Sequence, residues 1–182
     1  MRRLIALMVL SLCVPALLLA DEKEDAAVKA LTKLGAKVQI DKKSGAAKKV
    51  DLRGKAVADD HLKHVAALPK VQVLDLGGAK GKDDKYLPKQ ITDKGLAHLA
   101  NLTGVRELVL DGTHVTDAGL KHLANMKDLQ KLILSATRIT DEGLKDLAQF
   151  KKLISLWVDN TKVTKRGVLL LQKELPKLDV LE

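Results

Sequence analysis

Hydrophobic positions along the chain recur in blocks of 24 residues. Three consecutive blocks begin at Val105, Leu129 and Leu153 and open with the related patterns VRELVL, LQKLIL and LISLWV. In the second block, Leu132 and Leu134 alternate with polar or outward positions, as they do in a short strand with one buried face. Each block therefore predicts a strand at its start.

A second hydrophobic period follows after a short turn in each block. The chain contains three near-identical segments, QITDKGLAHL, HVTDAGLKHL and RITDEGLKDL. In the last of these, Leu144 and Leu147 lie at helical spacing. Thr140 can cap the first amides of that helix, and Asp141 falls in its first turn, where negative charge is favoured. Each block thus predicts one strand, one turn and one helix.

The repeat extends upstream of these blocks. Residues 47–70 form a degenerate copy of the same length, and the block beginning at Val71 fits once an insertion at about residues 78–88 is removed. Five such units lie within residues 47–182. A single strand-turn-helix unit cannot bury its apolar sides alone, so neighbouring units must stack. The sequence therefore predicts an α/β fold in the form of a curved solenoid of about five repeats.

The segments at both ends of the repeats are predicted to be caps. Within residues 21–46, a helix over Asp25–Leu34 should stop at Gly35. The segments AKVQID and KKVDL flank the turn-rich KKSG and predict a hairpin that covers the first repeat. At the other end, Leu178 and Leu181 repeat the start of a sixth strand.

The repeat pattern resembles leucine-rich repeats. Its T-[IV]-T-D-x-G-L segment is similar to the cysteine-containing subclass, which occurs in the recognition arms of F-box ubiquitin-ligase subunits and in many bacterial exported proteins. The resemblance covers roughly residues 47–181 and implies a curved solenoid that binds proteins. The subclass cysteines are absent, with Val105 or Leu129 and Thr113 or Thr137 in their places. No F-box-like segment is present, so only the fold and the binding habit are carried over.

The outward-facing strand positions predict a binding surface. Strand side chains alternate between faces, so the residues between the two inner leucines should point away from the core. The middle row of these positions is Asp51, Asp75, Val109, Ile133 and Trp157. Neighbouring strands lie about 4.8 Å apart, so the last three should form one apolar stripe. Polar positions flank the stripe, with Glu107, Lys131 and Ser155 on one side and Asp111, Ser135 and Asp159 on the other.

An apolar centre with a polar rim is typical of a protein-binding patch, and tryptophan is a frequent hot-spot residue. We therefore predict that Trp157, supported by Ile133 and Val109, binds a protein or peptide partner. In the alternative interpretation, valine and isoleucine are present for strand propensity and the C-terminal tail covers Trp157. The insertion could add Tyr86 to the binding surface, or it could be a surface excursion without function.

Charge and composition narrow the choice of partner. The chain of 182 residues carries a formal net charge of +9, from 32 Lys and Arg against 23 Asp and Glu, and has only one Phe, one Tyr and one Trp. A nucleic-acid surface needs clustered cations and stacking aromatics, whereas these lysines are scattered among acids. We predict no nucleic-acid partner. A structural or polysaccharide-associated envelope protein that binds through its lysine-rich surface remains the alternative function.

The first 20 residues have the order of a secretory signal peptide. Arg2 and Arg3 precede an apolar run that ends at Ala20, and this run is short for a membrane span. Leu18 is large for its place before the cut, which leaves an uncleaved anchor as an alternative. A lipoprotein site at Cys13 is a poorer fit because the preceding leucine is not small. We predict cleavage at Ala20 and a periplasmic or extracellular monomer without a stable membrane span.

Cleavage would remove Cys13, the only cysteine, so the mature chain could form no disulfide and no cysteine metal site. Its charge would be +7, since the removed segment holds two arginines and no acid. One row of the repeat contains His64, His98, His122 and Asp146. Ligands of one zinc ion lie about 2 Å from the metal, whereas packed helices are separated by roughly 8 to 10 Å. We therefore predict no metal and no cofactor.

Asp111, His114 and Ser135 contain the residue types of a hydrolytic triad near adjacent strand ends. No nucleophile elbow or oxyanion hole accompanies them, and the insertion lacks the spacing of a phosphate-binding loop. A hydrolase using these three residues is the second alternative. The preferred prediction is a binding module without catalysis.

Overall fold

A computed structural model describes residues 14–79 and 90–182, with side-chain positions from residue 22 onward. Residues 1–13 of the predicted signal peptide lie outside the described residues. Tyr86 and most of the predicted insertion also lie outside them.

Within the described residues, seven strands form one sheet in the order in which they occur along the chain. The first two strands are antiparallel, and every later pair is parallel. The strands are β1 (Lys37–Ile40), β2 (Ala47–Asp51), β3 (Val73–Asp75), β4 (Glu107–Val109), β5 (Lys131–Ile133), β6 (Ser155–Trp157) and β7 (Asp179–Leu181). The strands β2 to β6 open the five predicted repeats, and β7 is the predicted sixth strand.

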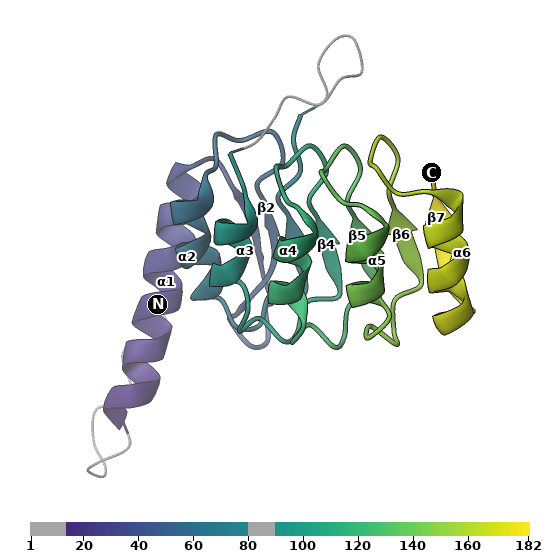
Figure 1. Cartoon of the computed structure of the whole chain (residues 1–182). Coiled ribbons are helices and arrows are strands. Elements are labelled where there is room, and N and C mark those ends of the chain that lie inside the picture. Colours follow the sequence, from purple (N-terminus) through teal and green to yellow (C-terminus); the bar gives the residue numbers. More distant parts are fainter. Residues whose placement is uncertain (1–13, 80–89) are drawn as a thin grey trace.

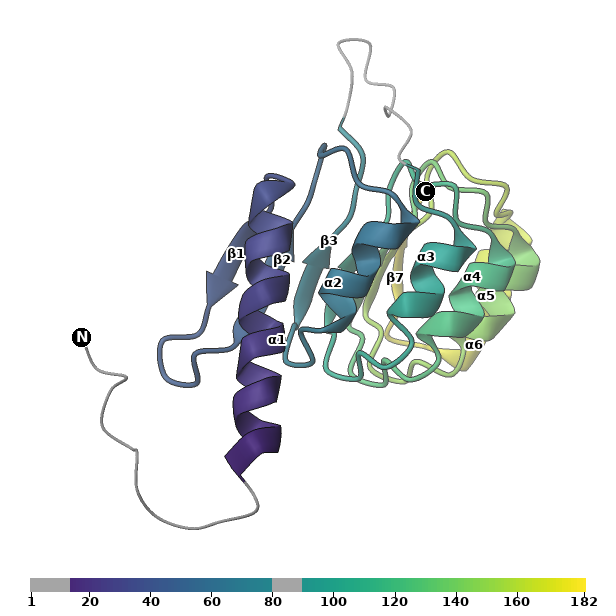
Figure 2. The same cartoon turned by 90° about the vertical axis from the view of Figure 1, so that its left-hand side faces the viewer.

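The helices of the repeats lie side by side along one face of the sheet (Figure 1). They are α2 (Leu62–Ala66), α3 (Asp93–His98), α4 (Asp117–Leu120), α5 (Asp141–Leu147) and α6 (Lys165–Glu174), with short 3-10 turns η1 (Asp59–His61) and η2 (Lys121–Leu123). The view along the sheet shows the helices following one another around an arc, with the strands on its other side (Figure 2). The predicted curved α/β solenoid is confirmed.

Aliphatic side chains from the strands fill the space between sheet and helices. The inward row pairs in register from strand to strand and is fully buried, and it consists of Val50, Leu74, Leu108, Leu132 and Leu156. The helix leucines Leu120 and Leu147 are also fully buried, so both hydrophobic periods of the repeat meet in one continuous core.

The N-terminal cap has the predicted hairpin, with β1 paired to β2. Its helix is longer than predicted: α1 spans Val14–Lys33 instead of beginning at Asp25, so helical backbone passes through the predicted cleavage position. Ala27 and Leu31 of α1 are buried in the core, which explains how the helix covers the end of the solenoid. No helix within the described part of the chain is long and apolar enough to cross a membrane.

Neighbouring repeats are joined by a ladder of carboxylates and threonines. The carboxylate of Asp117 accepts two hydrogen bonds from the next repeat, one from the backbone N–H of Thr140 at 2.8 Å and one from its hydroxyl at 2.7 Å. The threonine oxygen in turn accepts the N–H of Glu142 at 3.2 Å and caps α5. The same double hydrogen bond occurs four times, in the pairs Asp59 with Thr92, Asp93 with Thr116, Asp117 with Thr140 and Asp141 with Thr164.

Threonines occupy the positions where the resembling subclass has cysteines. The buried hydroxyl of Thr113 donates to the carbonyl of Leu110 at 2.7 Å, and Thr137 donates to Leu134 in the same way. The same two carbonyls also accept the backbone N–H groups of these threonines, so the turns after β4 and β5 are closed without a thiol.

Candidate binding surface on the strand face

The sheet register brings the predicted middle row together. Asp51, Asp75, Val109, Ile133 and Trp157 are direct partners of one another along β2 to β6. Trp157 pairs onward with Leu181 of β7. The sequence marked Leu181 as part of a sixth strand but did not place it in this row.

Exposure divides the row differently from the prediction. Val109 was expected to be an exposed member of the stripe, but it is only 7% exposed and belongs to the buried residues. It lies between Asp75 and Ile133 in the row. Ile133 is half-buried, Trp157 is 37% exposed and Leu181 is 39% exposed. We call Ile133, Trp157 and Leu181 the apolar strip.

Trp157 is held in place by two polar neighbours of the predicted rim. Its indole N–H donates to the hydroxyl of Ser155 at 3.3 Å, and the ammonium of Lys131 lies 5.8 Å from the ring centroid. A cation over the face of an indole ring is attracted by the electron density of that face. Trp157 pairs with Leu181 of the C-terminal strand and keeps 37% of its surface exposed, so this strand covers it only in part.

The other end of the strand face is closed by an ion-pair network. Arg53 donates to the carboxylates of Asp75 at 2.9 Å and Asp111 at 2.9 and 3.0 Å, so it connects the segment after β2 with the end of β3 and with the segment after β4. The guanidinium passes over Gly77, where an added Cβ would lie 2.3 Å from Asp111 Oδ1. Burial favours a lower pKa for Arg53, but its hydrogen bonds to Asp111 and Asp75 outweigh this and raise the pKa above its usual value.

This network was not predicted from the sequence. Arg53, Gly77 and Asp111 occupy the same position of successive repeats. A cation, a glycine and an acid in one such row were the sequence signal for an ion pair across the repeats. The opposite charges and the missing side chain between them become meaningful only when the strands are known to be in register.

The proposed hydrolytic residues are engaged with other partners. The carboxylate of Asp111 is 1% exposed and bonds to Arg53. The hydroxyl of Ser135 donates to the carboxylate of Asp159. His114 donates its backbone N–H to the carbonyl of Ile91 at 2.9 Å, while no hydrogen bond joins it to Asp111 or Ser135 in the described structure. The geometry gives no support to the triad.

The histidine row lies on the helix side, away from the strand face. His64, His98 and Asp146 come from α2, α3 and α5, while His122 lies in η2. Among residues 14–79 and 90–182, no group of three or more His, Cys, Asp or Glu side chains is close enough to hold a metal ion.

A stacked sheet with one helix per repeat defines a solenoid repeat protein. A sequence model described as Leucine Rich repeat matches residues 125–148, which hold the end of the α4 repeat and most of the α5 repeat. The chain therefore contains a leucine-rich repeat and folds as a leucine-rich-repeat solenoid. No curated protein matches its sequence significantly.

Solved structures similar to this chain include two leucine-rich repeat proteins and one internalin. The leucine-rich-repeat ectodomain of the receptor kinase SOBIR1 from Arabidopsis thaliana has a TM-score of 0.52 at 10% identity, covering 88% of this chain and 91% of that one. Internalin C2 from Listeria monocytogenes has a TM-score of 0.47 at 19% identity, covering 86% and 80%. A Leptospira interrogans leucine-rich repeat protein has a TM-score of 0.41 at 21% sequence identity. The match covers 65% of this chain and 33% of that one.

This chain thus spans a third of the Leptospira protein's length. The similarity to the SOBIR1 ectodomain shows a shared fold.

Proposed function

We propose that this protein binds a protein or peptide partner through its concave strand face. The observation that carries the proposal is the apolar strip, in which Trp157 stays exposed while Lys131 and Ser155 hold its ring. A partially exposed tryptophan whose orientation is already fixed loses little conformational freedom on binding. Glu107, Lys131 and Asp159 are the proposed polar contacts around the strip. Asp111 was predicted to be one of them, but it is buried and bonded to Arg53, so it is not available to a partner.

Truncation of the anchor tests the proposal. We expect Trp157→Ala to weaken partner capture by about 2 kcal/mol, or roughly thirtyfold, because hot-spot tryptophans contribute on this scale. The measurement compares captured protein after photo-cross-linking in extracts of the source cell, followed by titration of the purified partner against parent and variant. Equal affinity of Trp157→Ala and parent would remove the apolar strip as the binding site.

Ile154→Ala is the matched control. Ile154 is 53% exposed and precedes β6, so its removal deletes an exposed apolar side chain outside the strip. Capture should be unchanged in this variant. The salt dependence of binding distinguishes the proposed function from the alternative. Binding of a charged polymer through surface lysines should be lost as salt is added, whereas capture by the apolar strip should persist.

We further propose that the protein is exported to the cell envelope or the exterior. The support is the order of Arg2, Arg3, the apolar run and Ala20 in the sequence. Intact mass of the chain recovered from the source cell tests this, since cleavage after Ala20 leaves Asp21 as the first residue. A mass that includes residues 1–20 would favour the retained anchor.

A further inference from the structure

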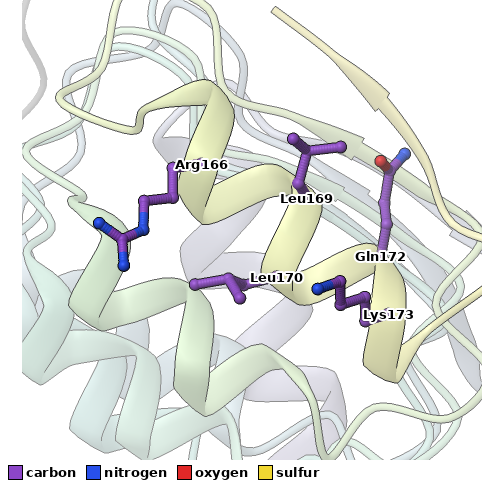
Figure 3. A pocket seen from close by; sticks show the side chains of 5 residues that line it. All are labelled: Arg166, Leu169, Leu170, Gln172 and Lys173. Atoms are coloured by element: carbon purple, nitrogen blue, oxygen red, sulfur yellow. The ribbon is translucent and has the colours of Figure 1, made fainter.

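The outward face of α6 differs from the other helices of the solenoid. Gly167, Val168 and Leu171 pack into the core, while Leu169 is 61% exposed and Leu170 is 51% exposed. Leu169 is the most exposed large hydrophobic side chain among the described residues. These leucines project from α6 beside Arg166 and Lys173 (Figure 3).

Comparison with the preceding repeats shows that the two leucines are specific to α6. At a spacing of 24 residues, Leu169 corresponds to Lys145 of α5 and Leu170 corresponds to Asp146. One repeat earlier, the residues are Lys121 and His122. Lys121 and Lys145 are exposed even though another repeat stacks beside each of them. The position of Leu169 therefore faces solvent in every one of these repeats, and stacking does not account for its apolar side chain.

Three cations share this outward face. At 100° per residue, Lys165, Arg166 and Lys173 fall on the same side of the helix as Leu169. All three are exposed, and none forms an ion pair with another described residue. Lys165 also occupies the repeat position of Asp141, so the carboxylate ladder ends at α6 and a cation stands where earlier helices have an acid.

The surface around Leu169 is open and belongs to one helix. A hollow of about 590 Å³ is lined by Arg166, Leu169, Leu170, Gln172 and Lys173, all from α6 (Figure 3). Leu170 also borders a second hollow of about 330 Å³ that is shared with Asp141, Leu144 and Lys145 of α5. The hollow beside Leu169 has no wall from another element, so this part of the face suits a planar surface better than an inserted peptide.

We propose that the outward face of α6 is a contact site for anionic lipid bilayers. Leu169 and Leu170 enter the boundary between headgroups and acyl chains, while Lys165, Arg166 and Lys173 pair with lipid phosphates. Unpaired cations beside exposed leucines are the composition of helices that lie in a membrane interface. The net charge, which is +9 for the full chain and +7 without Arg2 and Arg3, adds long-range attraction to an anionic surface.

This contact is distinct from the strand-face binding surface. The helices lie on one side of the sheet (Figure 2). The apolar strip alternates with the buried inward row that faces the helices, so it lies on the other side. A protein resting on lipid through α6 would therefore keep its apolar strip free, and either proposal can fail without the other.

A tryptophan placed at the contact reports whether α6 itself enters the bilayer. In the full chain with Trp157→Phe, Leu169→Trp supplies the only indole, and Lys63→Trp in the same background is the control at the equivalent position of α2. Vesicles of phosphatidylglycerol and phosphatidylcholine with brominated acyl chains should quench the indole in the Leu169→Trp protein and leave the Lys63→Trp protein unaffected. This readout is local, so binding through the apolar N-terminal segment does not imitate it. Absence of quenching in the Leu169→Trp protein would overturn the proposal.

A second comparison separates the contributions of leucines and cations. Adding Leu170→Asp to the reporter chain restores the residue of α5 at that position and should reduce quenching about tenfold at a fixed lipid concentration. Adding Arg166→Gln and Lys173→Gln should reduce it by at least about tenfold. Lys42→Gln with Lys43→Gln removes the same charge from the distant hairpin and should have little effect.

An acidic protein is the competing occupant. A soluble peptide of glutamate and leucine that shifts the indole emission of the Leu169→Trp protein, without quenching by brominated vesicles, would assign the face to an acidic protein partner and refute the lipid contact. Equal quenching by pure phosphatidylcholine vesicles would refute the role of the cations.

Discussion

The glycine of the T-D-x-G segment is required by the aspartate of the preceding repeat. Gly143 is buried within α5 and does not adopt a positive φ, so conformational freedom is not the reason for its presence. A Cβ built on Gly143 would lie 2.3 Å from Asp117 Oδ1. A Cβ built on Gly95, Gly119 or Gly167 would likewise lie 2.2 to 2.4 Å from the aspartate Oδ1 of the preceding repeat. The absent side chain leaves room for the carboxylate that binds threonine.

This contact predicts that Gly143→Ala destabilises the protein, although alanine is the better helix former. Alanine in a helix interior is favoured over glycine by about 1 kcal/mol. Displacing Asp117 from its two hydrogen bonds and overpacking the helix contact should outweigh that gain. We expect a net loss of about 2 to 3 kcal/mol in the free energy of unfolding. Urea denaturation followed by circular dichroism measures it.

Glu142→Ala is the control for helix propensity, because Glu142 is exposed in the same turn of α5. It should change the free energy of unfolding by no more than about 0.5 kcal/mol. A Gly143→Ala protein as stable as the parent would show that the carboxylate can move aside without loss, and the steric explanation of the motif would be wrong.

At the scale of the elements, each threonine serves its own helix and the previous one. Thr164 caps α6 through the N–H of Gly167 at 3.2 Å, and its own N–H and hydroxyl bond to Asp141 of α5 at 2.8 and 2.7 Å. The start of one helix is thereby fixed to the start of the next. This link sets the spacing of the helices independently of the apolar core.

Acid should weaken the link between α5 and α6. Hydrogen bonds from the backbone and then the side chain of Thr164 lower the pKa of Asp141 from its ordinary value of 3.8. A carboxyl with a lowered pKa in the folded state stabilises the fold above its unfolded pKa, and this contribution is lost as pH falls through the folded pKa. We therefore expect the stability difference between parent and Asp141→Asn to be largest at neutral pH and to shrink below about pH 4.

Urea denaturation of both proteins at neutral pH and near pH 3 measures this difference. Asp146→Asn is a suitable control, since Asp146 lies on the same helix and takes no part in the ladder. Its stability difference from the parent should depend less on pH than that of Asp141→Asn. A constant gap between parent and Asp141→Asn across this range would show that the ladder does not depend on the charge of Asp141.

At the scale of the whole molecule, most of the fold could be predicted from the repeated sequence pattern. Strand, turn and helix could be predicted because each inward position, such as Leu132 or Leu147, is apolar in nearly every copy. Threonine was recognised as a cap because capping acts within one repeat. The carboxylate ladder was missed because Asp117 and Thr140 are 23 residues apart and interact only after stacking.

The binding surface was only partly predictable for a similar reason. Alternation identifies which side chains point outward, and the register confirmed the alignment of Ile133 and Trp157. Exposure depends on the folded surroundings and was not predicted: Val109 is buried, and Arg53 reaches across Gly77 to pair with Asp111 at the other end of the face. The strand face is thus apolar and open toward β7 but charged and internally paired toward β2.

Each repeat of the solenoid contacts only its neighbours, so local stability should decrease from the central repeats toward the ends. Leu108 and Leu132 in the central strands are fully buried, whereas Leu175 and Leu178 near the last strand are 5% and 4% exposed. Within the described chain, β7 pairs on one side only. In repeat proteins each unit is stabilised by its neighbours, so a terminal unit can open without the rest.

We therefore expect hydrogen exchange to be at least about tenfold faster for the amides of β7 and the end of α6 than for those of β4 and β5. Mass spectrometry of peptides from the exchanged protein resolves these segments. Gly143→Ala should raise exchange most strongly in α5 and α6, because it weakens the contact between α4 and α5 and leaves the C-terminal units with fewer stabilising neighbours. Uniform protection from β2 to β7 would instead show that the solenoid unfolds as a single cooperative unit.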